Sequence, residues 1–517
     1  MDTILILDFG GQSTQLIGRR VRQLGVYSDI VRGDANLDSL TLTDVRGIIL
    51  SGSPYSVYEP GSPSVDQRIY GLGLPILGIC YGLQRLTVDH GGKVEALGRK
   101  EYGRARLTLG ERNGLFARVP VDSFVSWMSH GDSLTEVPQG FRVIAQSENG
   151  IPAAFVNEKR RLWGVQFHPE VSHCEYGMEV LDAFVSDICG ARKEWNMTTF
   201  FSQQREKLAA TVGKKPVVLL ISGGVDSCVV AALLLKSLDA SRVHLMYIDT
   251  GLMRKGESEE VLASLGTLGA EHVHAVDASK RFYAVLAGLT DPEQKRRAIG
   301  DMFMKVQETE IDALGVRDYF LAQGTLYTDL IESGRGVGDK AHLIKTHHNV
   351  RSPLVEARRA AGLIIEPLSS LYKDEVRELG LALGLPRSVV FRHPFPGPGL
   401  GVRILGEVTR EKCDLLREAD ALFMAELRSR GLYDTIWQAF CVLLPVKSVG
   451  VSGDMRRYGN VLALRAVASV DAITADVAAI PMSDLLEISS LITNRIPDIG
   501  RVVYDISSKP PATIEWE

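Results

Sequence analysis

The sequence predicts an α/β protein with two doubly wound, mostly parallel sheets and a smaller α+β domain at the C-terminal end. Residues 1–193 and 194–392 both alternate short apolar runs with helical patterns, which is typical of parallel sheets with helices on both faces. A Pro/Gly cluster, FRHPFPGPGLG, then interrupts regular structure, and helical and β-rich segments mix after it. We therefore expect domains at 1–193, 194–392 and 393–517, in line with roughly 150 residues per domain.

The first predicted domain contains short apolar runs bounded by glycine, proline and small polar residues. ILILDF, GIILSG, PILGIC and LWGVQF are predicted to form buried strands. TQLIGRRVRQLG lies between the first two and has apolar residues at helical spacing, which predicts a helix. A helix between two strands allows them to run parallel in one sheet.

The second predicted domain follows a polar helix, ARKEWNMTTFFSQQREKL, which we interpret as a linker. KPVVLLIS and RVHLMYID are predicted strands, and VDSCVVAALLLKSL and KDEVRELGLALGL are predicted helices. In the third domain, KCDLLREADALFMAELRSRG is predicted to be helical, and NVLALRAV and RVVYDIS are β-rich. The last domain is therefore predicted to be a compact α+β unit.

Composition narrows the class of protein. The chain has 58 basic and 63 acidic side chains, so a large non-specific nucleic-acid surface is not expected. Its apolar runs are too short for a transmembrane helix, and MDTILILDFGGQ lacks the basic leader and cleavage site of a signal peptide. The six cysteines form no CxxC pair, which argues against a zinc knuckle or a disulfide framework. We expect a cytoplasmic protein that binds neither a membrane nor a nucleic acid.

Cys80 lies where a predicted strand ends and a helix begins. Gly78 and Gly82 flank it in PILGICYGLQRL, which is the pattern of a nucleophile elbow, where a sharp turn exposes the nucleophile above the sheet. A helix N-terminus beneath the sulfur favours the reactive thiolate. For this segment alone, a buried structural cysteine is an equally good interpretation.

A second segment, WGVQFHPEV, favours the catalytic interpretation. His168 and Glu170 are two residues apart on an extended segment, so their side chains face the same side. A histidine that takes a thiol proton, oriented by a carboxylate, is the usual way to activate a cysteine nucleophile.

With these residues, GICYG, QFHPE and SGSP resemble the class I glutamine amidotransferases. The resemblance implies that Cys80 attacks the side-chain amide of glutamine, with His168 as base and Glu170 as orienting carboxylate. It also implies an oxyanion hole built from the backbone N–H groups of Tyr81 and of the SGSP loop at Ser53, with Gln84 seating the glutamine. The family usually shows SGGP, so Ser53 replaces a glycine whose backbone would adopt positive φ more cheaply.

KPVVLLISGGVDSCVVAALL predicts a strand, a glycine-containing loop and a helix. Gly223 and Gly224 allow backbone N–H groups to approach an anion at the positive end of the helix dipole. The loop is neither GxxxxGK[ST] nor GxGxxG. Asp226 would repel phosphates unless a cation intervened, so we expect Mg²⁺ as a cofactor.

SGGVDS resembles the PP-loop of ATP pyrophosphatases, which cleave ATP between its α and β phosphates. The resemblance implies that ATP is a co-substrate bound by the loop and by Asp249, at the carboxyl edge of the predicted sheet. The alternative for Asp249 is a turn residue. The expected ATP-binding residues are Ser222, Gly223, Gly224, Val225, Asp226, Ser227, Cys228, Asp249 and Lys345.

The order of the domains and several long segments resemble the glutamine-hydrolysing GMP synthetase family. The segments are SGGVDS, AQGTLYTDLIES, KTHHNV, FRHPFPGPGLGVR, SVGVSGD and KPPATIEWE. The resemblance implies that glutamine, ATP and xanthosine monophosphate (XMP) are the substrates, and that the chain forms a homodimer through its C-terminal domain. The implied XMP-binding residues are Arg296, Asp454, Lys509 and Glu515, and the implied metal-binding residues are Asp226 and Asp329.

Two alternatives stay open at this point. The adenylating domain could act on another acceptor, such as nicotinic acid adenine dinucleotide or a tRNA base. A catalytically silent regulatory or interaction protein is the second alternative, which the intact Cys80, His168, Glu170 and SGGVDS disfavour.

Overall fold

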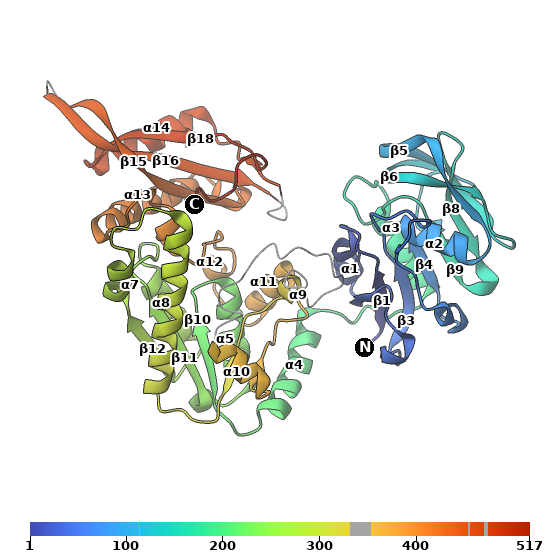
Figure 1. The fold of residues 1–517 in the computed structure, drawn as a ribbon, viewed down its shortest axis with the longest axis horizontal. Helices are drawn as coiled ribbons and strands as arrows, with labels where there is room; N and C mark the ends of the chain where they lie inside the picture. Colours follow the sequence, from blue (N-terminus) through green and yellow to red (C-terminus); the bar gives the residue numbers. More distant parts are fainter. Residues whose placement is uncertain (113, 331–352, 453–454, 470–473) are drawn as a thin grey trace. The chain divides into compact units, whose positions relative to one another are not determined.

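The computed structural model describes residues 1–112, 114–330, 353–452, 455–469 and 474–517 (Figure 1). Its chain divides into two compact units, the first built on Met1–Phe200 and the second on most of the chain that follows. The α/β class with large parallel sheets is confirmed, and so is the β-rich C-terminal part. The division at residues 193 and 392 stays a prediction. Within the described ranges, every helix is too short or too polar to cross a bilayer.

The first unit is built on a nine-stranded sheet in the order β2-β1-β3-β4-β9-β8-β7-β5-β6. The parallel strands are β1 (Thr3–Asp8), β2 (Tyr27–Arg32), β3 (Val45–Leu50), β4 (Ile76–Ile79) and β9 (Leu162–Val165). The antiparallel strands are β5 (Lys93–Leu109), β6 (Ser123–Glu136), β7 (Arg142–Ser147) and β8 (Pro152–Asn157). The four predicted strands are confirmed as β1, β3, β4 and β9.

Helices cover both faces of this sheet because successive side chains of each strand point to opposite sides. Ile4 and Ile6 of β1 pack in one core with α1 (Thr14–Gln23), α3 (Gly177–Asp182) and the π-helical segment Ala183–Ile188. The alternate residues of β1 pack in a second core with α2 (Tyr81–Asp89). The predicted helix TQLIGRRVRQLG is therefore confirmed as α1, and the parallel half of the sheet is doubly wound.

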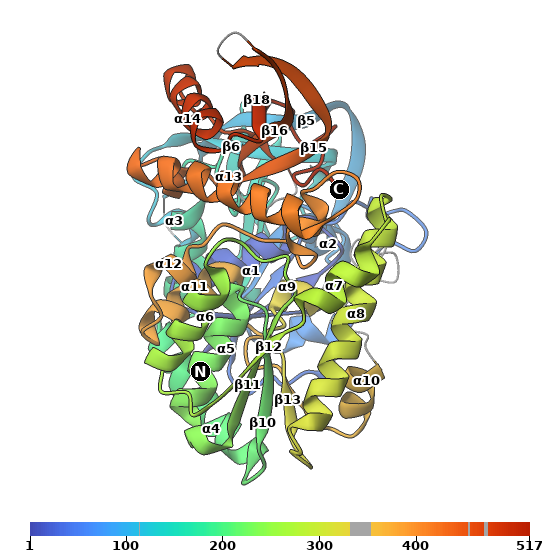
Figure 2. The ribbon, with the colours of Figure 1, turned by 90° about the vertical axis from the view of Figure 1, so that its left-hand side faces the viewer.

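The second unit contains a five-stranded parallel sheet in the order β12-β11-β10-β13-β14. Its strands are β10 (Val217–Ile221), β11 (Val243–Asp249), β12 (His272–Asp277), β13 (Phe320–Ala322) and β14 (Ile364–Ile365). Figure 2 shows α5 (Val225–Ser237) and α6 (Glu257–Thr267) on one side of the strands, and α7 (Ser279–Leu286) and α8 (Pro292–Ala313) on the other. The remaining helices of this part are α4 (Met197–Val212, which begins in the first unit), α10 (Pro353–Ala360), α11 (Lys373–Ala382) and α12 (Arg387–Val390). Helix α9 (Tyr327–Leu330) belongs to the first unit from Thr328 onward.

The C-terminal segment forms a separate sheet within the second unit. Strands β15 (Gln438–Ser452) and β16 (Met455–Ala468) make a long antiparallel pair, and β18 (Ile499–Asp505) pairs parallel with β16. Strand β17 (Asp476–Val477) and helices α13 (Arg410–Ser429) and α14 (Met482–Arg495) complete it. The predicted helix and the β-rich pieces NVLALRAV and RVVYDIS are confirmed as α13, β16 and β18.

Candidate functional site

Cys80 occupies the single-residue turn between β4 and α2. Its φ of 54° lies in the left-handed region, which non-glycine residues adopt rarely. A Cβ atom on Gly82 would collide with the Leu50 carbonyl, and one on Gly78 would collide with the backbone of Gly82. Both glycines thus permit the close packing of strand and helix that the turn requires. The expected strand–turn–helix geometry is present.

The thiol of Cys80 is almost buried and lies between polar groups. Its Sγ is 3.8 Å from the Ser129 carbonyl oxygen, to which it donates, and 3.7 Å from the amide Nε2 of Gln166. Only 6% of the Cys80 surface is exposed. The sulfur therefore has only a small exposed surface, and its polar neighbours are fixed by the fold.

His168 and Glu170 form a buried pair beside the thiol. The His168 Nδ1 atom lies 2.7 Å from Oε1 of Glu170, whose side chain is fully buried. Burial lowers the pKa of His168, but attraction to Glu170 and interaction with Cys80 outweigh burial and hold it well above its usual value. The raised pKa of His168 therefore favours an imidazolium beside the Cys80 sulfur.

The predicted glutamine-binding groups surround Cys80. The 51–53 loop approaches His168, since a Cβ on Gly52 would lie 3.6 Å from the imidazole Cε1. Ser53 donates its hydroxyl to the Phe9 carbonyl at 2.9 Å and accepts from the backbone N–H of Tyr55 at 3.3 Å. Its φ is not positive, so the serine causes no strain in this conformation. Its hydroxyl instead joins the 51–53 loop to the backbone at Phe9 by a hydrogen bond.

Helix α2 supplies two further predicted residues. Tyr81 follows Cys80 directly and anchors its hydroxyl on the Pro63 carbonyl at 2.6 Å. Gln84 donates its amide to the Asp132 carbonyl at 2.9 Å. Gln166, Ser129 and Asp132 were missed by the sequence analysis. The last two act through backbone carbonyls, which leave no residue-type signal.

The predicted phosphate loop lies between β10 and α5. Gly223 has a φ of 79°, which requires glycine, and Gly224 caps the helix. Ser227 donates its hydroxyl to the Gly224 carbonyl at 3.0 Å, and the backbone N–H of Ser222 lies 3.3 Å from the same hydroxyl. Cys228 is 1% exposed and packs inside, where burial raises its pKa to about 11. Cys228 therefore supports the helix and does not reach the loop surface.

A cavity of about 440 Å³ opens over this loop. It is lined by Ser222 to Asp226, by Thr250 and by four cationic side chains. The sequence analysis expected only one of the four, Arg296. The missed cations are Lys373, Arg377 and Arg392. Lys373 Nζ lies 2.7 Å from both carboxylate oxygens of Asp226. The cavity thus offers several positive charges and backbone donors to an anion.

Asp249 and Asp329 lie at the ends of short elements. Asp249 accepts from the backbone N–H of Gly251 and from the Ser258 hydroxyl, both at 2.8 Å, so its carboxylate is used by the turn after β11. The neighbouring Thr250, not Asp249, lines the cavity. Asp329 lies in α9. Lys345 falls outside the described residues.

The predicted XMP-binding residues have these positions. Glu515 forms a bidentate pair with the fully buried Arg403 at 2.8 and 3.1 Å and accepts from Gln438 at 2.7 Å. Arg296 lines the cavity over the phosphate loop and donates to the Glu517 carbonyl. Lys509 joins its backbone to that of Ala475 in an isolated bridge. Asp454 falls outside the described residues.

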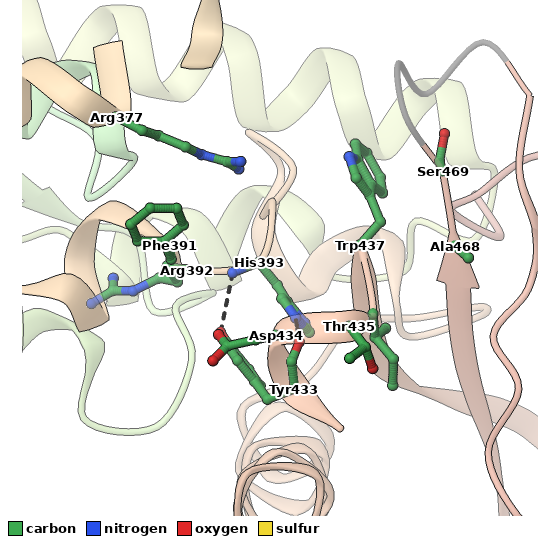
Figure 3. Close-up of a pocket in the computed structure, with 11 residues that line it drawn as sticks. Arg377, Phe391, Arg392, His393, Tyr433, Asp434, Thr435, Trp437, Ala468 and Ser469 are labelled. Atoms are coloured by element: carbon green, nitrogen blue, oxygen red, sulfur yellow. Dashed lines mark hydrogen bonds between the residues drawn. The ribbon is translucent and has the colours of Figure 1, made fainter. Parts of the chain in front are cut away.

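A smaller cavity of about 230 Å³ shares Arg377, Arg392 and His393 with the first (Figure 3). His393 stacks on Tyr433 with ring centroids 3.9 Å apart, and its backbone N–H donates to the Tyr433 hydroxyl at 3.1 Å. Burial lowers the pKa of His393 to about 4, so the ring is neutral at neutral pH. The wall between the two cavities is therefore aromatic and cationic.

A thiol on an elbow beside a buried histidine–glutamate pair is the arrangement of a cysteine nucleophile with its base and orienting carboxylate. Residues 5–188 match the class-I glutamine amidotransferase family, and residues 425–516 match the GMP synthase C-terminal domain.

Several curated relatives align with this chain over nearly its whole length. The chain is 49% identical to the GMP synthase [glutamine-hydrolyzing] of Aquifex aeolicus, over 99% of both proteins. The enzymes of the same name from Lactobacillus acidophilus and Staphylococcus aureus are 47% and 48% identical, over 100% of this chain and 98% and 99% of theirs. The chain belongs to the family of glutamine-hydrolysing GMP synthases.

Proposed function

We propose that this chain makes GMP from XMP with nitrogen taken from glutamine. The observation that carries the proposal is the Cys80 thiol at a strand–helix elbow beside the buried His168–Glu170 pair. The names of its full-length relatives indicate the reaction as a whole. We assign glutamine hydrolysis to residues 1–193, adenylation to 194–392, and dimerisation with part of the XMP site to 393–517.

In the first reaction, the Cys80 thiolate attacks the side-chain amide carbon of glutamine. The C–N bond breaks, the nitrogen leaves as ammonia with a proton from His168, and a thioester remains on the sulfur. Water then cleaves the thioester and releases glutamate. Backbone N–H groups at Ser53 and Tyr81 are the proposed donors to the oxyanion.

In the second reaction, a carbonyl oxygen of XMP attacks the α-phosphorus of ATP and pyrophosphate leaves. Ammonia then displaces AMP and forms GMP. The cavity over the glycine loop supports this assignment, because it combines a helix N-terminus with Arg296, Lys373 and Arg392. Arg296, Lys509 and Glu515 are the proposed contacts of XMP among the described residues, together with Asp454 outside them.

Mg²⁺ fits this cavity through the carboxylate of Asp226. One protein carboxylate completed by phosphate oxygens and water is a usual environment for this ion, and its charge would offset that of the triphosphate. Asp226 is paired with Lys373, so binding of the metal would require the carboxylate to exchange its partner.

We also propose that the protein is a cytoplasmic homodimer that associates through its C-terminal sheet. Val449 and Val451 of β15 and Tyr458 of β16, the cross-strand partner of Val449, face the same side of the sheet and are 45%, 81% and 59% exposed. Contiguous exposed apolar side chains are typical of an interaction surface. All six cysteines are free thiols, which suits a reducing compartment.

The products of a complete reaction test this function. With glutamine, ATP, Mg²⁺ and XMP, we expect glutamate, GMP, AMP and pyrophosphate in equal amounts. Formation of ADP and phosphate would contradict cleavage between the α and β phosphates. Replacing XMP by nicotinic acid adenine dinucleotide should give no pyrophosphate; release of pyrophosphate would favour another acceptor.

A further inference from the structure

A second imidazole–carboxylate pair lies beside the glutaminase centre and has no part in the chemistry described above. Glu101 on β5 and His130 on β6 are direct cross-strand partners. Their side chains are 4% and 2% exposed, and Oε2 of Glu101 lies 3.3 Å from Nε2 of His130. Burying two such groups is costly unless they satisfy each other.

The other atoms of the pair are held from both sides. Oε1 of Glu101 accepts from the Ser147 hydroxyl at 2.8 Å and from the Asn149 amide at 2.9 Å. Nδ1 of His130 lies 3.0 Å from the Asp132 carbonyl oxygen and 3.3 Å from the Ser133 hydroxyl. A carbonyl oxygen can only accept, so Nδ1 carries a hydrogen and donates it to Asp132.

This tautomer determines what must lie between the two side chains. With hydrogen on Nδ1, a neutral imidazole presents a lone pair at Nε2, and an ionised Glu101 presents another at Oε2. Burial lowers the pKa of His130, and nearby His168 lowers it further, while Glu101 opposes both. Neither Nε2 of His130 nor Oε2 of Glu101 makes a hydrogen bond in this structure. One proton placed between Nε2 and Oε2 would convert the repulsive contact into a hydrogen bond and leave the pair with no net charge.

The backbone on either side of His130 contacts Cys80, Gln84 and His168. The Ser129 carbonyl accepts from the Cys80 thiol, and the Asp132 carbonyl accepts from Gln84 as well as from His130. The Trp127 carbonyl, also on β6, accepts from the backbone N–H of His168 at 3.0 Å. Fixing residues 129–132 therefore fixes the contacts of both the nucleophile and Gln84.

We propose that Glu101 and His130, joined by one shared proton, are positioning residues of glutamine hydrolysis that hold the 129–132 backbone against Cys80 and Gln84. The shared proton also leaves the pair with no net charge, so the pair adds no net positive charge beside the imidazolium of His168. The inference rests on the proposed glutaminase function, since it concerns how that centre is held.

Two substitutions of Glu101 in the full-length enzyme separate a shared proton from a simple negative charge. Glu101→Gln keeps a donor for Nε2 and an acceptor for Ser147 and Asn149, so kcat/KM for glutamine should stay within about threefold. Glu101→Leu leaves the buried side chains of His130 and Ser147 facing an apolar group, and kcat/KM should fall about 100-fold, with kcat lowered and KM raised. Synthesis from ammonium salts should change less than about twofold in both variants.

One control variant and a second test variant complete the experiment. Glu95→Leu, at an exposed position on the same strand, should leave glutamine kinetics unchanged. Asn149→Ala removes one donor to Glu101 from an exposed position and should lower kcat/KM about 2- to 10-fold, which keeps the test decisive if Glu101→Leu does not fold.

The proposal is wrong if Glu101→Leu or Asn149→Ala leaves kcat/KM unchanged. It is also wrong if Glu101→Gln is as impaired as Glu101→Leu, or if ammonium-dependent synthesis falls in parallel with the glutamine reaction. A wild-type enzyme that releases no glutamate from glutamine would instead contradict the proposed function itself.

Discussion

The two centres of this protein use their charged groups in different ways. Around Cys80, the polar groups pair in an arrangement suited to catalysis, with His168 on Glu170, Gln84 on Asp132 and the thiol on Ser129. Over the glycine loop, cations pair with the protein's own carboxylates, as Lys373 does with Asp226 and Arg392 with Glu257. The groups of the first centre are already paired as the proposed chemistry requires, whereas the proposed binding of a phosphate at the second centre requires its ion pairs to exchange partners.

Replacement of the nucleophile should have the largest effect. Cys80→Ala removes the only sulfur placed beside His168 among the described residues, so glutamine-dependent synthesis should fall by roughly 10³-fold or more. Synthesis from ammonium salts should persist, because the second centre receives ammonia directly. The ratio of the two rates measures the effect, and loss of both in a folded variant would contradict two separable centres.

Neutralising Asp226 should affect the second centre alone. Asp226→Asn removes the proposed metal carboxylate and the partner of Lys373, so synthesis from glutamine and from ammonium should both fall by about 10²-fold. Hydrolysis of glutamine assayed by itself should be retained. As a matched control, Asp239→Asn, at an exposed turn after α5, should leave both rates unchanged.

Glu170→Gln should weaken the first centre and change its pH dependence. Loss of the carboxylate charge lowers the pKa of His168 toward its ordinary value near 6.5, and kcat for glutamine should fall by about 10²-fold. The pH above which His168 loses its proton should therefore move downward.

The raised pKa of His168 also makes the stability of the folded protein depend on pH. Because the pKa of His168 is raised on folding, its ion pair stabilises the protein fully below the ordinary histidine pKa, and this contribution is lost as the pH rises through the raised value. Rates of Cys80 alkylation and thermal unfolding, each followed against pH, check both parts. An identical alkylation profile in the variant would exclude control by Glu170.

Ser53→Gly should have the smallest effect. The substitution removes the contacts of the hydroxyl with Phe9 and Tyr55 and frees the loop beside His168. If the loop rearranges when the oxyanion forms, kcat for glutamine should rise about 2- to 5-fold. An unchanged kcat would show that the loop is already in its working conformation.

The sequence predicted the parts of the fold and site that depend on local patterns. Strands β1, β3, β4 and β9 followed from apolar runs, and His168 and Glu170 from a motif of three residues. Strand β6 was not singled out, because its buried residues alternate with partly exposed ones and leave no continuous apolar run.

The missed site residues depend on packing between distant segments. Ser129 and Asp132 contribute carbonyl oxygens, which every residue possesses. Lys373 and Arg377 reach the glycine loop because α11 packs against α5, about 150 positions earlier in the chain. Such contacts carry no signal at the level of residue type or spacing.

The transfer of nitrogen tests the central claim most directly. The enzyme would be supplied with amide-¹⁵N-labelled glutamine, ATP, Mg²⁺ and XMP, and the GMP analysed by mass spectrometry alongside the Cys80→Ala variant. We expect one ¹⁵N in each GMP formed by the wild-type enzyme and no labelled GMP from the variant. Labelled GMP from Cys80→Ala, or no GMP from the wild-type enzyme, would contradict the account.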